Sequence, residues 1–245
     1  MASFGPIAPY YDELMSQVPY DTWAGYYRLL LAQLGHEPES LLDVCCGTGT
    51  CAEILTEEGY QVTGFDISEP MIAEARRKAE EKGLDIDYHV ADAAELDLGT
   101  QFESAYSFFD SLNYITDPEH LRKSIIKVGE HLVPGGSFIF DVNTEYAFTE
   151  HMFDQEDLRK ATKLKYHWRG DYDTETKIIK VKMNFWYGEE EFQEVHVQRA
   201  YSDEELREYL DDADIDVVKV FDSYTLDPPR KKSDRLHYVA VKRTG

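Results

Sequence analysis

Residues 41–49 read Leu41-Leu42-Asp43-Val44-Cys45-Cys46-Gly47-Thr48-Gly49, an apolar run that ends in two closely spaced glycines. Residues 40–44 have the length and composition of a buried strand, and residues 46–50 those of a turn. A helical pattern follows over residues 51–58. Glycine has no Cβ, so a ligand can approach both the backbone of this turn and the N-terminus of the helix. The sequence therefore predicts a ligand site between the first strand and the helix that follows it.

Strand and helix patterns alternate on both sides of this turn. Apolar residues at helical spacing predict helices, and short apolar runs bounded by turn residues predict strands. The expected helices cover residues 22–34, 51–58, 70–82, 118–131 and 202–210, and the expected strands cover residues 40–44, 61–65, 86–90, 104–109, 137–142, 215–221 and 237–241. Such alternation is typical of a parallel sheet with helices on both faces. We therefore expect an α/β fold with a doubly wound, seven-stranded, mostly parallel sheet of the Rossmann-like type.

The pattern changes between residues 144 and 199. Residues 177–187 alternate between polar and apolar side chains, as a half-exposed strand does, and residues 163–169 and 192–199 can pair with them. We expect residues 144–199 to form an antiparallel β insertion, which acts either as a lid over a substrate or as the contact of a homodimer. The core then comprises the remainder, residues 1–143 and 200–245.

The composition argues against several classes of protein. The chain has 245 residues, with 25 lysines and arginines against 48 aspartates and glutamates, which gives a formal net charge of −23 at pH 7. This charge repels phosphate backbones, so a nucleic-acid substrate is not expected. No apolar run approaches the roughly 18 residues of a membrane span, and no basic and then apolar segment opens the chain, so we expect a cytoplasmic protein. The three cysteines match no zinc or redox spacing, and no metal site is expected.

Asp66 ends the second expected strand about 20 residues after the glycine turn, where a doubly wound fold offers a carboxylate to the two hydroxyls of a bound ribose. A nicotinamide dinucleotide and S-adenosylmethionine both carry such a ribose. Residues 47–52 also satisfy the relaxed dinucleotide fingerprint G-x-G-x-x-A, which is a weak signal on its own. The glycine turn and Asp66 therefore leave both cofactors open.

Two further aspartates discriminate between these cofactors. Asp43 lies inside the first strand, and Asp92 follows the third strand in the motif Val90-Ala91-Asp92-Ala93. With the glycine turn and Asp66, these motifs resemble those of the class I S-adenosylmethionine-dependent methyltransferases over residues 10–142. The place of the insertion is similar to that in the amino-sugar N-methyltransferases. Cys45 departs from the family pattern, which often has a glycine there, so the turn must accept a Cβ.

The resemblance implies S-adenosylmethionine as the cofactor and a role for several residues. The Asp66-Ile67-Ser68 position would bind the ribose, Met71 would pack near the adenine, and Asp92-Ala93 would hold the adenine edge. A helix cap for Ser68 and core contacts for Met71 and the aromatic residues are the alternative interpretations. Tyrosines near the N-terminus would close over the methionine end. The expected cofactor-binding residues are Tyr11, Tyr20, Asp43, Cys46, Gly47, Thr48, Gly49, Asp66, Ile67, Met71, Asp92, Ala93, Phe108 and Phe109.

The fourth strand runs into residues 107–114 at the carboxyl edge of the sheet, where open α/β folds bind ligands. Asp110 and Tyr114 are the candidate catalytic bases in this segment. If the inserted sheet folds over the cleft, three histidines are further candidate bases, which are His151, His167 and His196. In that case an apolar pocket for the acceptor could be built from the aromatic residues of the insertion, which are Tyr166, Trp168, Phe185, Trp186 and Tyr187.

The expected function is methyl transfer from S-adenosylmethionine, by in-line displacement, to a nitrogen or oxygen of a small-molecule acceptor. Two alternatives stay open on the sequence. One is a non-catalytic S-adenosylmethionine-binding protein, because no base is decisive. The other is an NAD-dependent oxidoreductase, which the relaxed fingerprint supports. Residues 230–232, Arg230-Lys231-Lys232, are the concentrated basic run of this acidic chain and are a candidate site for an anionic group of the acceptor.

Overall fold

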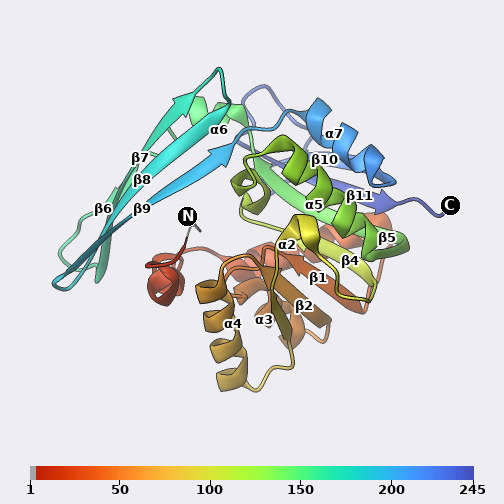
Figure 1. Ribbon diagram of the computed structural model, residues 1–245, viewed down its shortest axis with the longest axis horizontal. Helices are drawn as coiled ribbons and strands as arrows, with labels where there is room; N and C mark the ends of the chain where they lie inside the picture. The colour runs from red at the N-terminus through yellow and green to blue at the C-terminus, as the bar shows by residue number, and fades with distance from the viewer. Residues whose placement is uncertain (1–3) are drawn as a thin grey trace.

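The computed structural model describes residues 4–245, which form two β-sheets (Figure 1). The larger sheet has seven strands in the order β10-β11-β5-β4-β1-β2-β3. These strands are β1 (Ser40–Val44), β2 (Gln61–Asp66), β3 (Asp87–Val90), β4 (Phe102–Ser107), β5 (Leu132–Asn143), β10 (Ile215–Asp222) and β11 (Arg235–Lys242). β11 is antiparallel to both of its neighbours, and the other pairs are parallel. The expected doubly wound, mostly parallel sheet is confirmed.

Helices pack on both faces of the larger sheet because each has one apolar side. One core cluster contains apolar residues of α2 (Tyr20–Leu34), α3 (Thr50–Glu57) and α4 (Glu69–Lys82). The other contains apolar residues of α5 (Pro118–Glu130) and α7 (Asp203–Asp212). The central strands β1 and β4 are almost wholly buried, as parallel strands covered on both faces are. Their carboxyl ends meet at one edge, which is the edge that carries the site.

A second sheet contains β6 (Gln155–Asp157), β7 (Leu164–Asp173), β8 (Ile178–Tyr187) and β9 (Glu190–Arg199), all paired antiparallel in that order. It follows α6 (Glu145–Thr149) after β5, and β9 leads back to α7. Successive side chains of a strand point to opposite faces, so one face of this sheet is apolar and buried while the other is exposed. We call these the inner and outer faces. The inner face holds Tyr166, Trp168, Met183, Phe185, Glu194, His196 and Gln198.

Residues 4–18, which we call the N-terminal strap, lie between the second sheet and the core (Figure 1). The strap contains the 3-10 helix η1 (Ala8–Tyr10) and the short helix α1 (Tyr11–Leu14). Ile7 is 1% exposed and joins the apolar cluster of the inner face. The strap therefore closes the space between the two sheets on a third side.

The structure differs from the sequence expectation where β4 ends. The strand was expected to reach Phe109 but ends at Ser107, because Phe109 and Asp110 have φ angles of 66° and 52°. This left-handed backbone turns the chain into the 3-10 helix η3 (Ser111–Tyr114) and aims Tyr114 toward the second sheet. Within residues 4–245, the structure has no helix of the length and apolarity that crossing a membrane requires.

Candidate functional site

A cavity of about 850 Å³ lies between the two sheets and the N-terminal strap. Residues at the carboxyl ends of β1, β2 and β4 form one wall, and inner-face residues of β7, β8 and β9 form the opposite wall. All the residues predicted to bind the cofactor line this cavity except Gly49, and both predicted bases line it as well. The structure thus gathers residues from distant parts of the sequence around one space.

The glycine turn combines an open position and a crowded one. Gly47 has φ +56°, and a Cβ built there would meet no atom within 4 Å, so this residue faces free space. Gly49 has φ +75°, and its Cβ would lie 2.1 Å from the hydroxyl oxygen of Tyr88. Gly49 therefore lies behind the cavity wall, where it allows Tyr88 to pack. Cys45, which stands where the family often has a glycine, adopts a left-handed backbone with φ +62°.

The two glycines should respond differently to replacement by alanine. We expect Gly49→Ala to lower the free energy of unfolding by about 2–4 kcal/mol, because the new Cβ overlaps Tyr88. We expect Gly47→Ala to cost about 1 kcal/mol, since only the backbone conformation opposes it. Gly47→Ala should nevertheless weaken cofactor binding, because the methyl group enters the cavity. Chemical denaturation and ligand titration of both variants measure these effects, and equal losses of stability would contradict the assignment.

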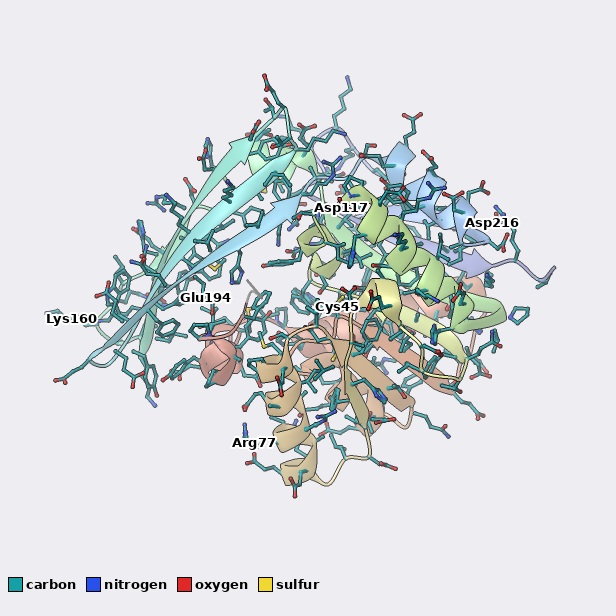
Figure 2. The ribbon with its side chains drawn as sticks, viewed as in Figure 1. Cys45, Arg77, Asp117, Lys160, Glu194 and Asp216 are labelled. Carbon is teal, nitrogen blue, oxygen red and sulfur yellow. The ribbon has the colours of Figure 1, made fainter. Side chains whose placement is uncertain are left out.

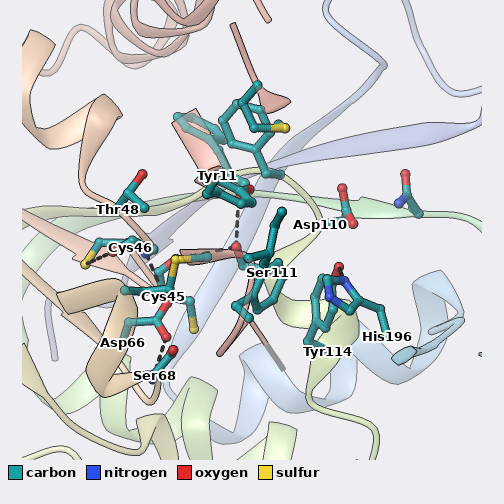
Figure 3. Close-up of a pocket in the computed structure, with 18 of the residues that line it drawn as sticks. Tyr11, Cys45, Cys46, Thr48, Asp66, Ser68, Asp110, Ser111, Tyr114 and His196 are labelled. Atoms are coloured by element: carbon teal, nitrogen blue, oxygen red, sulfur yellow. Dashed lines mark hydrogen bonds between the residues drawn. The ribbon is translucent and has the colours of Figure 1, made fainter. Parts of the chain in front are cut away.

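Asp66, at the end of β2, is held in place by backbone donors. Its Oδ2 accepts from the N–H of Gly47 at 3.0 Å, and its Oδ1 accepts from the N–H of Ser68 at 2.8 Å. Burial raises the pKa of Asp66, and these donors oppose the shift. Ser68 is the N-cap residue of α4, but its hydroxyl makes no capping hydrogen bond, and its oxygen is buried without a partner among residues 4–245. Figure 3 shows Asp66 and Ser68 side by side beneath the cysteines of the turn.

Two other aspartates line the same part of the cavity. Asp43 is 3% exposed, and burial raises its pKa to about 7. Its Oδ2 has no hydrogen-bond partner within the described part of the chain. Oδ1 of Asp92 accepts from the N–H of Ala94 and lies 2.7 Å from Nε2 of His120. Met71 is 2% exposed, so it packs in the core and also borders the cavity.

These residues fit S-adenosylmethionine. Carboxylates with free lone pairs at Asp66 and Asp92, and an unpartnered oxygen at Asp43, suit a ligand that is cationic and carries ribose hydroxyls and an exocyclic amine. The open Gly47 lets such a ligand approach the backbone and the N-terminus of α3.

The N-terminal strap is fastened at both ends. On the core side, Asp12 accepts from the hydroxyl of Thr48 at 2.6 Å and pairs with Lys78 at 2.5 Å. On the other side, Glu194 of β9 accepts from the N–H of Ile7 at 2.9 Å and from the N–H of Phe4 at 3.3 Å. Figure 2 shows Glu194 on the strap side of the second sheet. The strap thereby holds Tyr11 against the cavity, and Tyr20, at the start of α2, lines the same wall.

A chain of three polar side chains connects the cavity to the strap. The hydroxyl of Tyr114 lies 3.0 Å from Nδ1 of His196, and Nε2 of His196 lies 2.6 Å from Glu194. His196 is 3% exposed, and Tyr114 and His196 both line the cavity (Figure 3). Burial and the charge of Asp110 raise the pKa of Tyr114 well above its ordinary value, so its hydroxyl stays protonated at neutral pH. The other candidate histidines, His151 and His167, do not belong to the cavity lining among the described residues.

Asp110 belongs to a separate ion-pair cluster at the cavity wall. Arg235 donates to Asp110 at 2.7 Å and to Asp141 at 2.5 Å, and Gln198 donates to the other oxygen of Asp110 at 2.6 Å. Burial raises the pKa of Asp110, and the charge of Arg235 opposes this shift. Both oxygens of Asp110 are thus engaged, so Tyr114 is the freer of the two predicted bases.

Sequence reasoning missed three of these residues: Glu194, Gln198 and Arg235. Glu194 and Gln198 flank His196 at intervals of two residues on β9, which places all three on one face of a strand. That spacing is a usable signal. Arg235 carries no such signal, because only the fold brings it to Asp110.

Comparisons with known proteins agree with this arrangement. A family profile described as a methyltransferase domain matches residues 41–136. A candidate methyltransferase of Geobacillus sp. (strain WCH70) is 30% identical over 247 residues, covering 98% of this chain and 100% of that protein. A dTDP-3-amino-3,4,6-trideoxy-alpha-D-glucopyranose N,N-dimethyltransferase of Streptomyces venezuelae is 36% identical over 105 residues, covering 43% of each chain. The crystal structure of an S-adenosylmethionine-dependent methyltransferase from Clostridium acetobutylicum ATCC 824 has a TM-score of 0.86 at 26% identity, covering 97% of this chain and 98% of that chain.

The fold, the glycine turn and the three aspartates are those of a class I methyltransferase. The chain belongs to the class I S-adenosylmethionine-dependent methyltransferases, and S-adenosylmethionine is its cofactor. A sugar N-methyltransferase and an amino pentose methyltransferase share its fold, with TM-scores of 0.80 and 0.73. The protein is therefore an enzyme, and the NAD-dependent oxidoreductase and the non-catalytic binding protein are both set aside.

Proposed function

We propose that this methyltransferase transfers a methyl group to an oxygen or nitrogen of a small-molecule acceptor, and that Tyr114, His196 and Glu194 remove the proton of the acceptor. The observation that carries this proposal is the continuous contact from Tyr114 through His196 to Glu194 at the cavity wall. Asp66, Asp43 and Asp92 hold the cofactor at the other end of the same cavity. The inner face of the second sheet covers the acceptor, so residues 144–199 act as a lid rather than as a dimer contact.

When it is bound, S-adenosylmethionine supplies an activated methyl group whose leaving group is a neutral thioether. The acceptor atom forms a bond to the methyl carbon as the sulfur–methyl bond breaks, and its proton must leave. With Nε2–H donated to Glu194, Nδ1 of His196 keeps a lone pair that accepts the hydroxyl proton of Tyr114. The acceptor passes its proton to the oxygen of Tyr114, and Tyr114 passes its own to His196. Glu194 then stabilises the imidazolium.

The raised pKa of Tyr114 decides its role in this relay. A tyrosinate would require the loss of a proton that burial and Asp110 both disfavour. Tyr114 therefore acts by exchanging one proton for another, and His196 is the group that finally holds it. The strap excludes water from the relay, because the ring of Phe4 lies 4.4 Å from that of His196 and 5.2 Å from that of Tyr114.

The variant Glu194→Gln tests this role of the second sheet. The amide can still meet Nε2 of His196 but carries no charge to stabilise an imidazolium, so we expect kcat to fall about 10- to 100-fold. The measurement is transfer of labelled methyl from S-adenosylmethionine to a panel of small amines and hydroxy compounds.

Glu190→Gln is the matched control for this variant. Glu190 lies on the same strand and accepts from the hydroxyl of Tyr10 in the strap at 2.7 Å, but it has no contact with His196. If the two variants lower kcat equally, Glu194 only fastens the strap, and the proton relay is wrong. If the wild-type protein methylates no member of either chemical class, the proposed acceptor is wrong.

A further inference from the structure

The cavity is divided into two chemically different ends. The end at the glycine turn carries the three aspartates Asp43, Asp66 and Asp92. The end under the second sheet is lined by apolar and aromatic side chains of β7, β8, α6 and the segment after α6, which are Ala147, Met152, Phe153, Tyr166, Trp168, Met183 and Phe185. Trp186 lies on the outer face of the same sheet and does not belong to this lining among the described residues. Tyr114 and His196 lie on the wall of the same cavity.

Among residues 4–245, no lysine or arginine that lines this cavity is free of an ion pair. Arg235 is the one lysine or arginine in its lining, and its guanidinium already binds the carboxylates of Asp110 and Asp141. The basic run 230–232 lies outside the lining, and Arg230 pairs with Asp222 at 2.5 Å. A diphosphate needs cationic donors to offset its desolvation, and this chain carries a net charge of −23. A nucleotide-linked sugar, such as the one named for the Streptomyces venezuelae relative, therefore does not match this cavity.

One polar atom stands out in the apolar end. Nε1 of Trp168 is buried and has no hydrogen-bond partner in residues 4–245, although an indole N–H normally finds one when buried. The ring lies 4.8 Å from that of Tyr166 and 6.3 Å from that of Phe185. Trp168 lines the aromatic end of the cavity and carries there a buried donor without a partner.

We infer that the acceptor is an uncharged, flat and mainly apolar molecule, with an O–H or N–H group for Tyr114 and a hydrogen-bond acceptor for Trp168. This inference rests on the proposed function, since it places the reacting group at the relay. Aromatic walls bind a flat ring by burial and stacking, while the unused indole N–H fixes its orientation. Sugar rings, which need several polar partners, gain little from such walls.

The test compares two flat two-ring phenols, 6-hydroxyquinoline and 2-naphthol, with uridine diphosphate glucosamine. Only 6-hydroxyquinoline has a ring nitrogen that can accept a hydrogen bond. Calorimetric titrations use the full chain saturated with S-adenosylhomocysteine, and binding of that compound is measured first. We expect both phenols to bind with Kd of roughly 0.1–1 mM and the nucleotide sugar not to bind.

The variant Trp168→Phe keeps an aromatic ring and removes the N–H. We expect it to weaken 6-hydroxyquinoline about three- to tenfold and 2-naphthol less than twofold. Trp186→Phe, on the outer face of the sheet, is the matched control and should change neither Kd. Thermal unfolding of each variant separates a binding effect from a loss of structure.

The outcomes separate the two proposals. If S-adenosylhomocysteine does not bind, the assignment of this cavity to methyl transfer fails. If it binds but the phenols do not, or if the nucleotide sugar binds instead, only the acceptor class is overturned. Equal weakening of both phenols by Trp168→Phe overturns the role of the indole N–H.

Discussion

Replacing Tyr114 by phenylalanine is expected to lower kcat for methyl transfer at least about 100-fold and to leave the affinity for S-adenosylmethionine within about twofold. Positioned proton transfer contributes roughly 10²–10⁴-fold, and Tyr114 lines the cavity and is the member of the relay proposed to meet the acceptor. The phenyl ring preserves the shape of the wall and removes only the hydroxyl. Steady-state kinetics with an acceptor of the predicted class, together with calorimetry for the cofactor, measure the two parts of this expectation.

His196→Gln should give a loss of similar size, because it removes the group that finally holds the proton. His167→Gln is the matched control, since His167 belongs to the same sheet but not to the described cavity lining. The double variant Tyr114→Phe with His196→Gln should lose little more than either single variant, because members of one relay are not additive. Full turnover in Tyr114→Phe would rule out the relay and leave Asp110 as the remaining predicted base.

Replacing Asp66 by alanine is expected to lower the affinity for S-adenosylmethionine roughly 10- to 150-fold. This range corresponds to about 1.5–3 kcal/mol for charge-assisted hydrogen bonds to the ribose hydroxyls. The backbone donors of Gly47 and Ser68 fix the orientation of the carboxylate, so the cost of ordering it is already met in the free protein. Competition with labelled S-adenosylmethionine measures the change.

Asp87→Ala is the control for charge, because it removes one carboxylate from the start of the neighbouring β3, where Asp87 is exposed. If Asp87→Ala weakens binding as much as Asp66→Ala, the effect comes from net charge. If Asp66→Ala binds the cofactor as tightly as the wild type, Asp66 does not hold the ribose, and the cofactor lies elsewhere in the cavity.

The fold was predictable because its signals are local. The glycine turn, the capping box at Ser202 and Glu205, and the glycines that end α2 and α4 each act within a few residues of chain. Periodicity then places the strands and helices to within a few residues. The end of β4 was missed because non-glycine residues rarely adopt left-handed φ angles. The residue types of Phe109 and Asp110 do not indicate that they do so here.

That the predicted cofactor residues gather around one cavity was predictable for the same reason, since parallel strands bring their carboxyl ends to one edge. The opposite wall of the cavity was not predictable from the sequence. It forms only when the second sheet folds over that edge, which brings β9 into contact with residues 110–114, more than 80 residues away in the chain. Sequence alone therefore left three histidines open, and of these His196 lines the cavity while His151 and His167 lie outside the lining that the described residues form. Arg235 was unpredictable because its partners, Asp110 and Asp141, lie on other strands.

The most direct test of the relay is nuclear magnetic resonance of the His196 imidazole in protein labelled with ¹⁵N-histidine and saturated with S-adenosylhomocysteine at pH 7. His196→Gln identifies the resonances of this ring. The relay requires the ring proton on Nε2, bound to Glu194, and an unprotonated Nδ1 that accepts from Tyr114. A proton on Nδ1, in either the other tautomer or the imidazolium, would contradict it, because His196 could then take no proton from Tyr114.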